Sequence, residues 1–244
     1  MSGGGTVLRA LHHGRAPGDP LVLPGPWDAA SARVFADAGF AALATPSAGI
    51  AASLGYPDGG GTPPGEMFAA VARIVRAVDV PVSADVEDGY GLPPGELVER
   101  LLEAGAAGCN LEDTDLRTGE LKDPRRHADW LARVCAAADG ALVVNARVDT
   151  FLRGRPGAAA AVERGRLYAA AGADCVYPIA APPELLAELA DGIGVPININ
   201  ARPDGPSPAR LGELGATRVT FGGSLHQVTV TALRQTAERL GGTG

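Results

Sequence analysis

The sequence has few aromatic residues, few cysteines and no long apolar run. Aromatic residues make up only 5% of the 244 residues, so alanine, glycine and short aliphatic side chains must fill most of the core. The three cysteines, Cys109, Cys135 and Cys175, are too few and too scattered for a disulfide framework or a structural zinc site. No uncharged apolar run reaches the roughly 18 residues of a membrane-spanning helix, so no membrane span is expected.

Positive charge is also scarce. The formal net charge is −7 and no basic stripe stands out, so nucleic acid is not expected as the main partner. The first five residues, Met-Ser-Gly-Gly-Gly, lack the charged and apolar regions of a signal peptide. Together with the scattered cysteines, these features predict a protein of the reducing cytoplasm.

What the sequence does contain is a regular alternation of short apolar segments and helix-like stretches. With 46% hydrophobic and 20% charged residues, the chain can form one large α/β domain. Strands are expected at residues 21–23, 41–45, 80–85, 108–112, 141–147, 174–179, 195–200 and 218–221. Eight strand–helix units in about 250 residues are typical of a (β/α)8 TIM barrel.

The barrel is expected to occupy residues 21–244 as a single domain, after an N-terminal arm of residues 1–20. Residues 46–64 are rich in Gly and Pro and are expected to form a long loop, and residues 224–240 the last helix. An open doubly wound sheet is the alternative fold. It usually has about five or six strands and carries a Gly-rich phosphate loop after the first, and that loop is missing here.

Three acids follow the third expected strand: Asp85, Glu87 and Asp88. Because alternate residues of a strand share a face, Asp85 and Glu87 are expected to point one way and Asp88 the other. Glu112 ends the fourth strand, so Asp85, Glu87 and Glu112 can converge on one cation if the strand order is sequential. Such oxygen ligands suit Mg²⁺, with Mn²⁺ as a second choice. The simpler interpretation is a solvated acidic loop.

Asn145 and Arg147 share a face at the end of the fifth strand. A buried arginine there suits bidentate binding of a carboxylate or phosphate. With the acids, it predicts a site for a small anionic substrate that chelates the metal, such as a 2-oxo acid. The alternative is that Arg147 only pairs with Asp85 or Glu112 to close the barrel. Further polar candidates near strand ends, where barrel enzymes carry their chemistry, are Trp27, Ser47, Gly49, Asp58, Asn110, Asn198 and Asn200.

Six motifs between about residues 21 and 225 occur in a characteristic order. They are Leu23-Pro-Gly-Pro-Trp-Asp-Ala-Ala-Ser-Ala-Arg33, Ala44-Thr-Pro-Ser-Ala-Gly-Ile50, Gly55-Tyr-Pro-Asp58, Ser83-Ala-Asp-Val-Glu-Asp-Gly-Tyr-Gly91, Gly108-Cys-Asn-Leu-Glu-Asp113 and Asn145-Ala-Arg-Val-Asp-Thr150. In these motifs the chain resembles the isocitrate lyase/phosphoenolpyruvate mutase superfamily. The resemblance implies a phosphoenolpyruvate/pyruvate-type TIM barrel that uses Mg²⁺ to act on small 2-oxo acids or related dicarboxylates.

The resemblance also implies roles for individual residues. Asp85 would be a metal ligand, whereas Asp58, Glu87 and Glu112 would hold the metal or its waters. Asp58 also matches the position where the mutases are thought to carry a nucleophile. The substrate-binding candidates are Trp27, Ser47, Ala48, Gly49, Asn145, Arg147 and Asn200. Because family members often form dimers or tetramers, a homodimer or homotetramer is expected.

The chain departs from the family pattern after the fourth strand. The lyases carry a Lys-Lys/Arg-Cys-Gly-His motif on a gating loop, but residues 113–124 contain neither Cys nor His. This argues against isocitrate or methylisocitrate lyase activity. The same stretch lacks the asparagine-containing loop of phosphonopyruvate enzymes. Glu87 replaces the usual second Asp, and Ile179 stands where the family often has a polar residue.

Three functions therefore follow as hypotheses. The first is a Mg²⁺-dependent lyase or decarboxylase that cleaves a C–C bond next to the carbonyl carbon through a metal-stabilised enolate, with Asp58 and Arg147 as catalytic residues. The second is P–C bond chemistry on phosphoenolpyruvate or phosphonopyruvate, with Asp58 as nucleophile or water activator. The third is a non-catalytic binder of 2-oxo acids. Fold alone does not decide between them.

Overall fold

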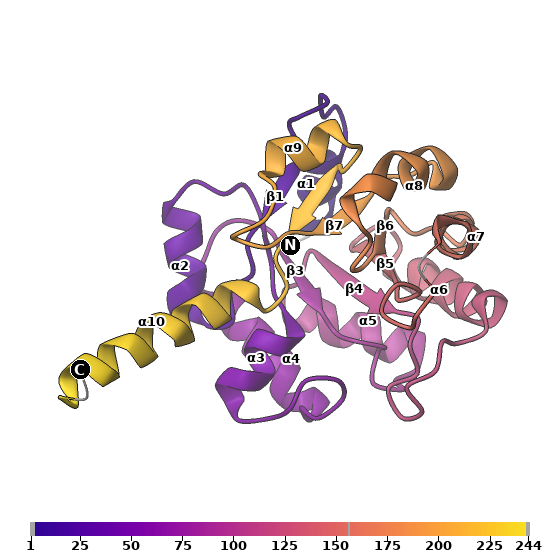
Figure 1. Cartoon of the computed structure of the whole chain (residues 1–244). Helices are drawn as coiled ribbons and strands as arrows, with labels where there is room; N and C mark the ends of the chain where they lie inside the picture. Colours follow the sequence, from indigo (N-terminus) through magenta and orange to yellow (C-terminus); the bar gives the residue numbers. More distant parts are fainter. Residues whose placement is uncertain (1–2, 156, 243–244) are drawn as a thin grey trace.

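A computed structural model describes residues 3–155 and 157–242, and within them eight parallel strands form a barrel (Figure 1). One sheet has the order β2-β3-β4-β5-β6 and the other the order β1-β8-β7. A parallel bridge from Val176 to Ile197 joins β6 to β7, and the amide of Ala44 donates to Pro24 O between β1 and β2. The strands are β1 (Leu21–Leu23), β2 (Leu43–Ala44), β3 (Val82–Asp85), β4 (Gly108–Glu112), β5 (Val143–Val148), β6 (Cys175–Pro178), β7 (Asn198–Asn200) and β8 (Arg218–Thr220). The predicted barrel with sequential strand order is confirmed.

Helices surround the strands (Figure 1). They are α1 (Gly4–His12), α2 (Ala29–Asp37), α3 (Ser47–Leu54), α4 (Pro64–Val75), α5 (Pro94–Glu103), α6 (Pro124–Ala138), α7 (Ala158–Ala170), η1 (Pro183–Leu185), α8 (Leu186–Ile193), α9 (Pro208–Glu213) and α10 (Ser224–Leu240). The local sequence explains where several of these helices begin. Asp28 and Ser31 form a capping box at α2, and Asp123 accepts from two amides at the start of α6.

Helix α3 corrects the expectation of one long loop over residues 46–64. Pro46 is extended and precedes an Ala-rich run, and Gly55 ends the helix with a φ of 87°. The Gly and Pro residues that predicted a loop cluster after Leu54, so the composition of the whole stretch concealed a helix in its first half. The consequence for function is that the amides of residues 47 and 48 lie at a helix N-terminus.

The core has two layers. Outward-facing strand residues such as Cys109 and Leu111 pack under the helices, whereas a smaller inner cluster fills the floor of the barrel. Leu8 of α1 belongs to the inner cluster and is fully buried, so α1 lies across the floor. A Cβ on Gly108 would lie 2.6 Å from Val143 O and 3.0 Å from Leu8 Cδ2, so glycine is required for this close approach.

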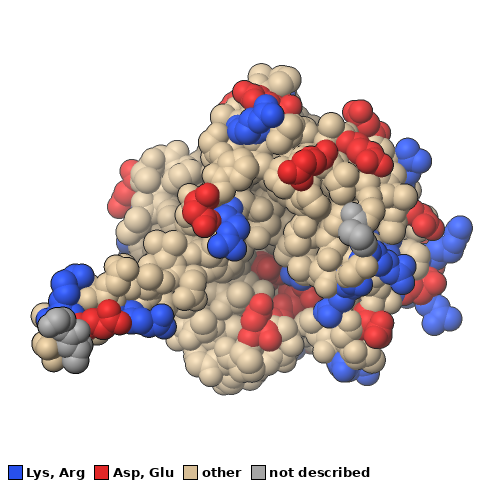
Figure 2. Space-filling view, viewed as in Figure 1, with Lys and Arg blue, Asp and Glu red and all other residues tan. Residues whose placement is uncertain are grey.

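Helix α10 differs from the other α-helices because none of its residues is buried (Figure 1, yellow). Its exposed apolar side chains include Val228 at 54% and Leu233 at 68% exposure. These residues agree with the expected homodimer or homotetramer, which stays a prediction. Lys, Arg, Asp and Glu are interspersed over the face shown in Figure 2, without an extended basic stripe. In the described part of the chain, no helix combines the length and apolarity that a bilayer crossing needs.

We predict that His12 on the floor makes the protein sensitive to mild acid. Burial lowers the pKa of His12 from 6.5 to about 4, and the charge of Arg218 adds to the effect. Below about pH 6.5 the unfolded chain binds a proton that the folded chain does not, so stability that is present at neutral pH is lost as the pH falls. Between about pH 7.5 and pH 5 the loss is about 2 kcal/mol.

Urea unfolding at both pH values measures this contribution. The variant His12→Gln should lose less stability on acidification than the unmodified protein. His13→Gln is the matched control, because the neighbouring His13 side chain is exposed. The same pH dependence in all three proteins would show that His12 is not the source.

Candidate active site

A cavity of about 250 Å³ opens at the carboxyl ends of the strands. Figure 2 shows a hollow with acidic atoms in its depth on the corresponding face. Of the predicted site residues, seven line the cavity: Ser47, Ala48, Asp58, Asp85, Asn110, Arg147 and Asn200. The others, Trp27, Gly49, Glu87, Glu112, Asn145 and Asn198, do not line it. The walls also include apolar side chains, among them Leu152 and Ile179.

Asp85 is the acid at the end of β3. Within the described residues, its carboxylate accepts only long hydrogen bonds, from the Glu87 amide at 3.3 Å and from Ser47 Oγ at 3.4 Å. Burial raises the pKa of Asp85, Arg147 opposes that rise, and Asp58 adds to it. This carboxylate is therefore half-buried with little hydrogen bonding, and a cation beside it would stabilise its charge.

Glu87 is held by two backbone amides. Strand β3 ends at Asp85, and Glu87 has a φ of 53°, so strand alternation no longer sets its direction. Its two carboxylate oxygens accept from the amides of Gly59 at 3.2 Å and Gly60 at 2.9 Å. Burial raises the pKa of Glu87 to about 7, although the Gly60 hydrogen bond opposes the rise. That Asp85 and Glu87 point the same way stays a prediction; Asp85 lines the cavity and Glu87 does not.

Glu112 is paired with Arg147. The distance from Arg147 Nη1 to Glu112 Oε2 is 2.5 Å, and Arg147 Nε lies 2.7 Å from Asp149 Oδ1. Arg147 Nη2 also donates to Asp149 Oδ2 at 3.2 Å. Burial raises the pKa of Glu112, and the adjacent guanidinium opposes this. A guanidinium has five N–H donors, so two remain for a ligand beyond these three contacts.

A buried network holds Arg147 in place from behind. Asp149 accepts from Thr114 Oγ1 at 2.6 Å, and its amide donates to Asp113 Oδ1 at 2.8 Å. Asp113 in turn accepts from Arg164 and from Tyr168 Oη, both at 2.8 Å. Both aspartates are fully buried. Sequence reasoning missed Asp113 and Asp149, because nothing local shows that they meet across two strands and a helix.

These pairings determine which acids remain available to bind a metal ion. Among the described residues, no three Asp, Glu, His or Cys side chains are grouped as a ready metal site. Glu87 is occupied by amides and Glu112 by Arg147, which leaves Asp85, with Asp58, facing the cavity. Mg²⁺ commonly keeps several waters and binds through about one or two carboxylates. The residues present therefore fit a hydrated Mg²⁺, and not an ion enclosed by three acids.

Trp27 and Gly49 form a second layer behind the cavity wall. A Cβ on Gly49 would lie 3.3 Å from Trp27 Cβ and 3.0 Å from Pro46 Cγ, so the glycine lets this wall close. The rings of Trp27 and His226 of α10 meet edge-on, with 5.1 Å between their centroids. These two candidates are therefore placed to support the wall.

Asn110 lies on the cavity surface, whereas its neighbour Asn145 is fully buried beneath it. The two are register partners on β4 and β5, and Asn145 Nδ2 donates to Asn110 Oδ1 at 2.8 Å. Asn110 was recognised in the sequence as a polar strand end, but nothing there separated it from Asn145. The depth of each residue in the barrel makes the difference.

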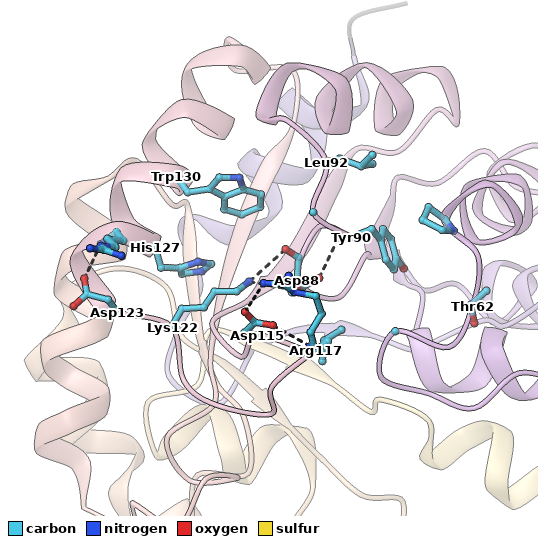
Figure 3. Close-up of a pocket in the computed structure, with 15 residues that line it drawn as sticks. Thr62, Asp88, Tyr90, Leu92, Asp115, Arg117, Lys122, Asp123, His127 and Trp130 are labelled. Atoms are coloured by element: carbon cyan, nitrogen blue, oxygen red, sulfur yellow. Dashed lines mark hydrogen bonds and ion pairs between the residues drawn. The ribbon is translucent and has the colours of Figure 1, made fainter.

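A second, larger cavity of about 870 Å³ lies on the other side of the β3–α5 turn (Figure 3). Asp88 lines it, whereas Asp85 lines the smaller cavity, and Asp88 pairs with Lys122 Nζ at 3.4 Å. Lys122 also lies 5.9 Å from the centre of the Trp130 ring. The lysine of the loop between β4 and α6 is thus held at this second cavity and does not line the barrel mouth.

Comparisons with known proteins agree with the geometry. The sequence profile of the phosphoenolpyruvate phosphomutase family matches residues 8–241. An uncharacterised protein of Mycobacterium tuberculosis is 37% identical over 214 residues, which are 87% of this chain and 80% of that protein. The 2-methylisocitrate lyase of Aeropyrum pernix is 35% identical over 84% of this chain and 68% of the lyase. The structure of oxaloacetate acetylhydrolase in complex with its product oxalate has a TM-score of 0.87 and 26% identity, over 97% of this chain and 86% of that chain.

We predict that Asp149→Asn destabilises the protein strongly, because it removes one partner of a buried ion pair. The expected loss in free energy of unfolding is about 3–5 kcal/mol, measured by urea denaturation. Asp204→Asn is the matched control, since Arg202 and Asp204 have the same sequence spacing but are each 75% exposed. That pair should contribute less than about 1 kcal/mol. Similar losses in both variants would contradict the assigned role of Asp149.

Proposed function

This chain belongs to the phosphoenolpyruvate phosphomutase family of the isocitrate lyase/phosphoenolpyruvate mutase superfamily, and we propose that it is a Mg²⁺-dependent lyase for a small 2-oxo acid or related dicarboxylate. It would cleave the C–C bond next to the carbonyl carbon. Relatives of the chain are named as C–C lyases, an acetylhydrolase and phosphomutases. The observation that carries the proposal is that Asp85 and Arg147, of opposite charge, face one small cavity.

The size and lining of the cavity support a small acid as substrate. A volume of about 250 Å³ is below the range of about 300–1,000 Å³ that is usual for drug-sized ligands. Arg147 would hold a carboxylate with its two free N–H groups, because its other donors are fixed by Glu112 and Asp149. Leu152 and Ile179 would contact a short alkyl part and exclude water from it.

The chemistry would proceed by breaking the bond at the carbon beside the carbonyl group, so that its electron pair stays on the 2-oxo acid fragment as an enolate. The other fragment would leave as CO₂ or as a carbonyl compound, and a proton would then convert the enolate into the 2-oxo acid. When bound at Asp85, Mg²⁺ would supply positive charge close to the oxygen that becomes anionic. Ser47 and Ala48 begin helix α3 and line the same cavity, so their backbone amides would donate to that oxygen or to a neighbouring one. Rigid placement of Arg147 would fix the orientation of the substrate.

Calorimetric titration with oxalate tests the proposal, since oxalate resembles the enolate of pyruvate. We expect oxalate to bind more tightly than pyruvate with Mg²⁺ and to lose most of its affinity in EDTA. Asp85→Asn should remove the metal dependence. Asp88→Asn, which changes the acid that faces the second cavity, should leave it unchanged. Binding of oxalate that ignores both Mg²⁺ and Asp85 would overturn the proposed metal site, and tight binding without turnover on any acid would favour a non-catalytic binder.

A second candidate function is P–C bond chemistry. Asp58 favours it, because its exposed side chain lines the cavity that also holds Asp85. In this alternative Asp58 would be the nucleophile or would activate water at phosphorus.

Phosphonopyruvate separates the two candidates. If P–C chemistry is correct, the unmodified protein should release or exchange phosphate from phosphonopyruvate, and Asp58→Asn should abolish this. Asp204→Asn should have no effect, because Asp204 belongs to an exposed ion pair and does not line the cavity. Failure of phosphonopyruvate to bind or react would remove this alternative.

A further inference from the structure

Arg218 is a fully buried arginine inside the barrel, at the start of β8. No carboxylate lies within ion-pair distance of it in residues 3–155 and 157–242, and its Nε and Nη1 atoms have no hydrogen-bond partner. Burial lowers the pKa of Arg218 from its ordinary value, but a guanidinium keeps its proton in proteins. A charge of this kind is costly to bury, so what it contacts is informative.

The Nη2 group of Arg218 reaches two acceptors from neighbouring strands. It donates to Ser83 Oγ on β3 and to Asn110 Oδ1 on β4, each at 3.3 Å. Asn110 also lines the cavity at the barrel mouth. Arg218 therefore lies one layer below the candidate active site and is connected to it through the side-chain amide of Asn110.

The chemistry of arginine fixes the polarity of that amide. The oxygen and nitrogen of an asparagine side chain look alike, and their assignment normally rests on the surrounding hydrogen bonds. A guanidinium can only donate, so the Asn110 atom facing Arg218 must be the oxygen. The same oxygen accepts from Asn145 Nδ2 at 2.8 Å. Both contacts hold Oδ1 downward, and Asn110 Nδ2 makes no hydrogen bond within the described chain.

We propose that Arg218 is a positioning residue that fixes Asn110 as a hydrogen-bond donor to an acceptor oxygen of the substrate. This inference rests on the proposed function and adds a specificity determinant to it. Donors of Arg147 and Asn110 would face a carboxylate, carbonyl or enolate oxygen from two sides of the cavity. A substrate with an ammonium group in that place would find no acceptor on Asn110, so the floor selects 2-oxo acids over 2-amino acids.

Arg218 acts through Asn110 and does not touch the ligand. Its unpartnered nitrogens are buried away from solvent, and Arg218 does not line the cavity. Asn145 is likewise fully buried, and its Oδ1 has no partner. The unsatisfied atoms of this cluster thus lie below the surface, and the amide that reaches the surface is that of Asn110.

The composition of the chain allows a direct test, because asparagine occurs only at positions 110, 145, 198 and 200. Selective ¹⁵N labelling of the asparagine side chains gives four pairs of amide proton signals, one pair for each asparagine, which single substitutions assign. On addition of oxalate with Mg²⁺, the Asn110 amide protons should shift more than those of Asn145 and Asn198, which do not line the cavity. An unshifted Asn110 amide in the oxalate complex would overturn the proposal.

Affinity gives the second readout. Asn110→Asp replaces the donor by a carboxylate of the same shape, and oxalate should bind about 10- to 100-fold more weakly. Asn198→Asp is the matched control, because it places the same charge on β7 away from the cavity, and it should change affinity less than about threefold. Arg218→Met should weaken oxalate binding, whereas Arg218→Lys retains a group that can only donate and should restore it. Equal affinities of Asn110→Asp and the unmodified protein would sink the idea.

Failure of the proposed function is recognised separately. If the unmodified protein binds no oxalate, the proposed function falls, but the polarity of Asn110 still has a readout. The Asn110 amide faces the cavity and should exchange rapidly with water, while the Asn145 amide, bonded to Asn110 Oδ1, should be protected. Rapid exchange at Asn110 would support the assigned polarity, and protection there would overturn it.

Discussion

The pairing of Arg147 with two buried carboxylates determines which acids of the barrel mouth can meet a ligand. Glu112 and Asp149 occupy three of the five donors of Arg147 and are themselves neutralised by it. Removing one partner of a buried ion pair destabilises the folded protein strongly, because the other charge stays buried without a partner. The pair therefore keeps its geometry, and the site is built around a fixed cation with two free N–H groups.

The turn after β3 gives three neighbouring acids different partners. Asp85 faces the cavity, Glu87 is bound by two glycine amides, and Asp88 pairs with Lys122 at the second cavity. Left-handed backbone at Glu87 and Tyr90 makes this separation within six residues. A non-glycine residue in that conformation costs about 1–3 kcal/mol, which is tolerated where the surrounding contacts hold it. One carboxylate directed at the cavity suits a metal ion that keeps its water.

The interior of the barrel adds polarity from below. The Nη2 group of Arg218 and the Nδ2 group of Asn145 both donate to the side-chain oxygen of Asn110. The cavity therefore has negatively charged carboxylates at its rim and hydrogen-bond donors at its floor. A ligand that carries an anionic oxygen and coordinates a cation complements both sides, as a chelating 2-oxo acid does. The apolar side chains of Leu152 and Ile179 limit its size and polarity.

The sequence by itself determined the barrel, its strand order and the family, because periodicity and ordered motifs are local properties that the fold does not overrule. It also placed Asp85 and Arg147 at strand ends that share one edge of the sheet. Tertiary structure alone decided that Glu112 forms an ion pair with Arg147 and that Asp113 and Asp149 hold Arg147 in place. These contacts join residues from β4, β5 and α7. It also decided that Asn110 reaches the cavity while Asn145 stays beneath it, because depth in a barrel depends on the stagger of neighbouring strands, and a single strand does not record that stagger.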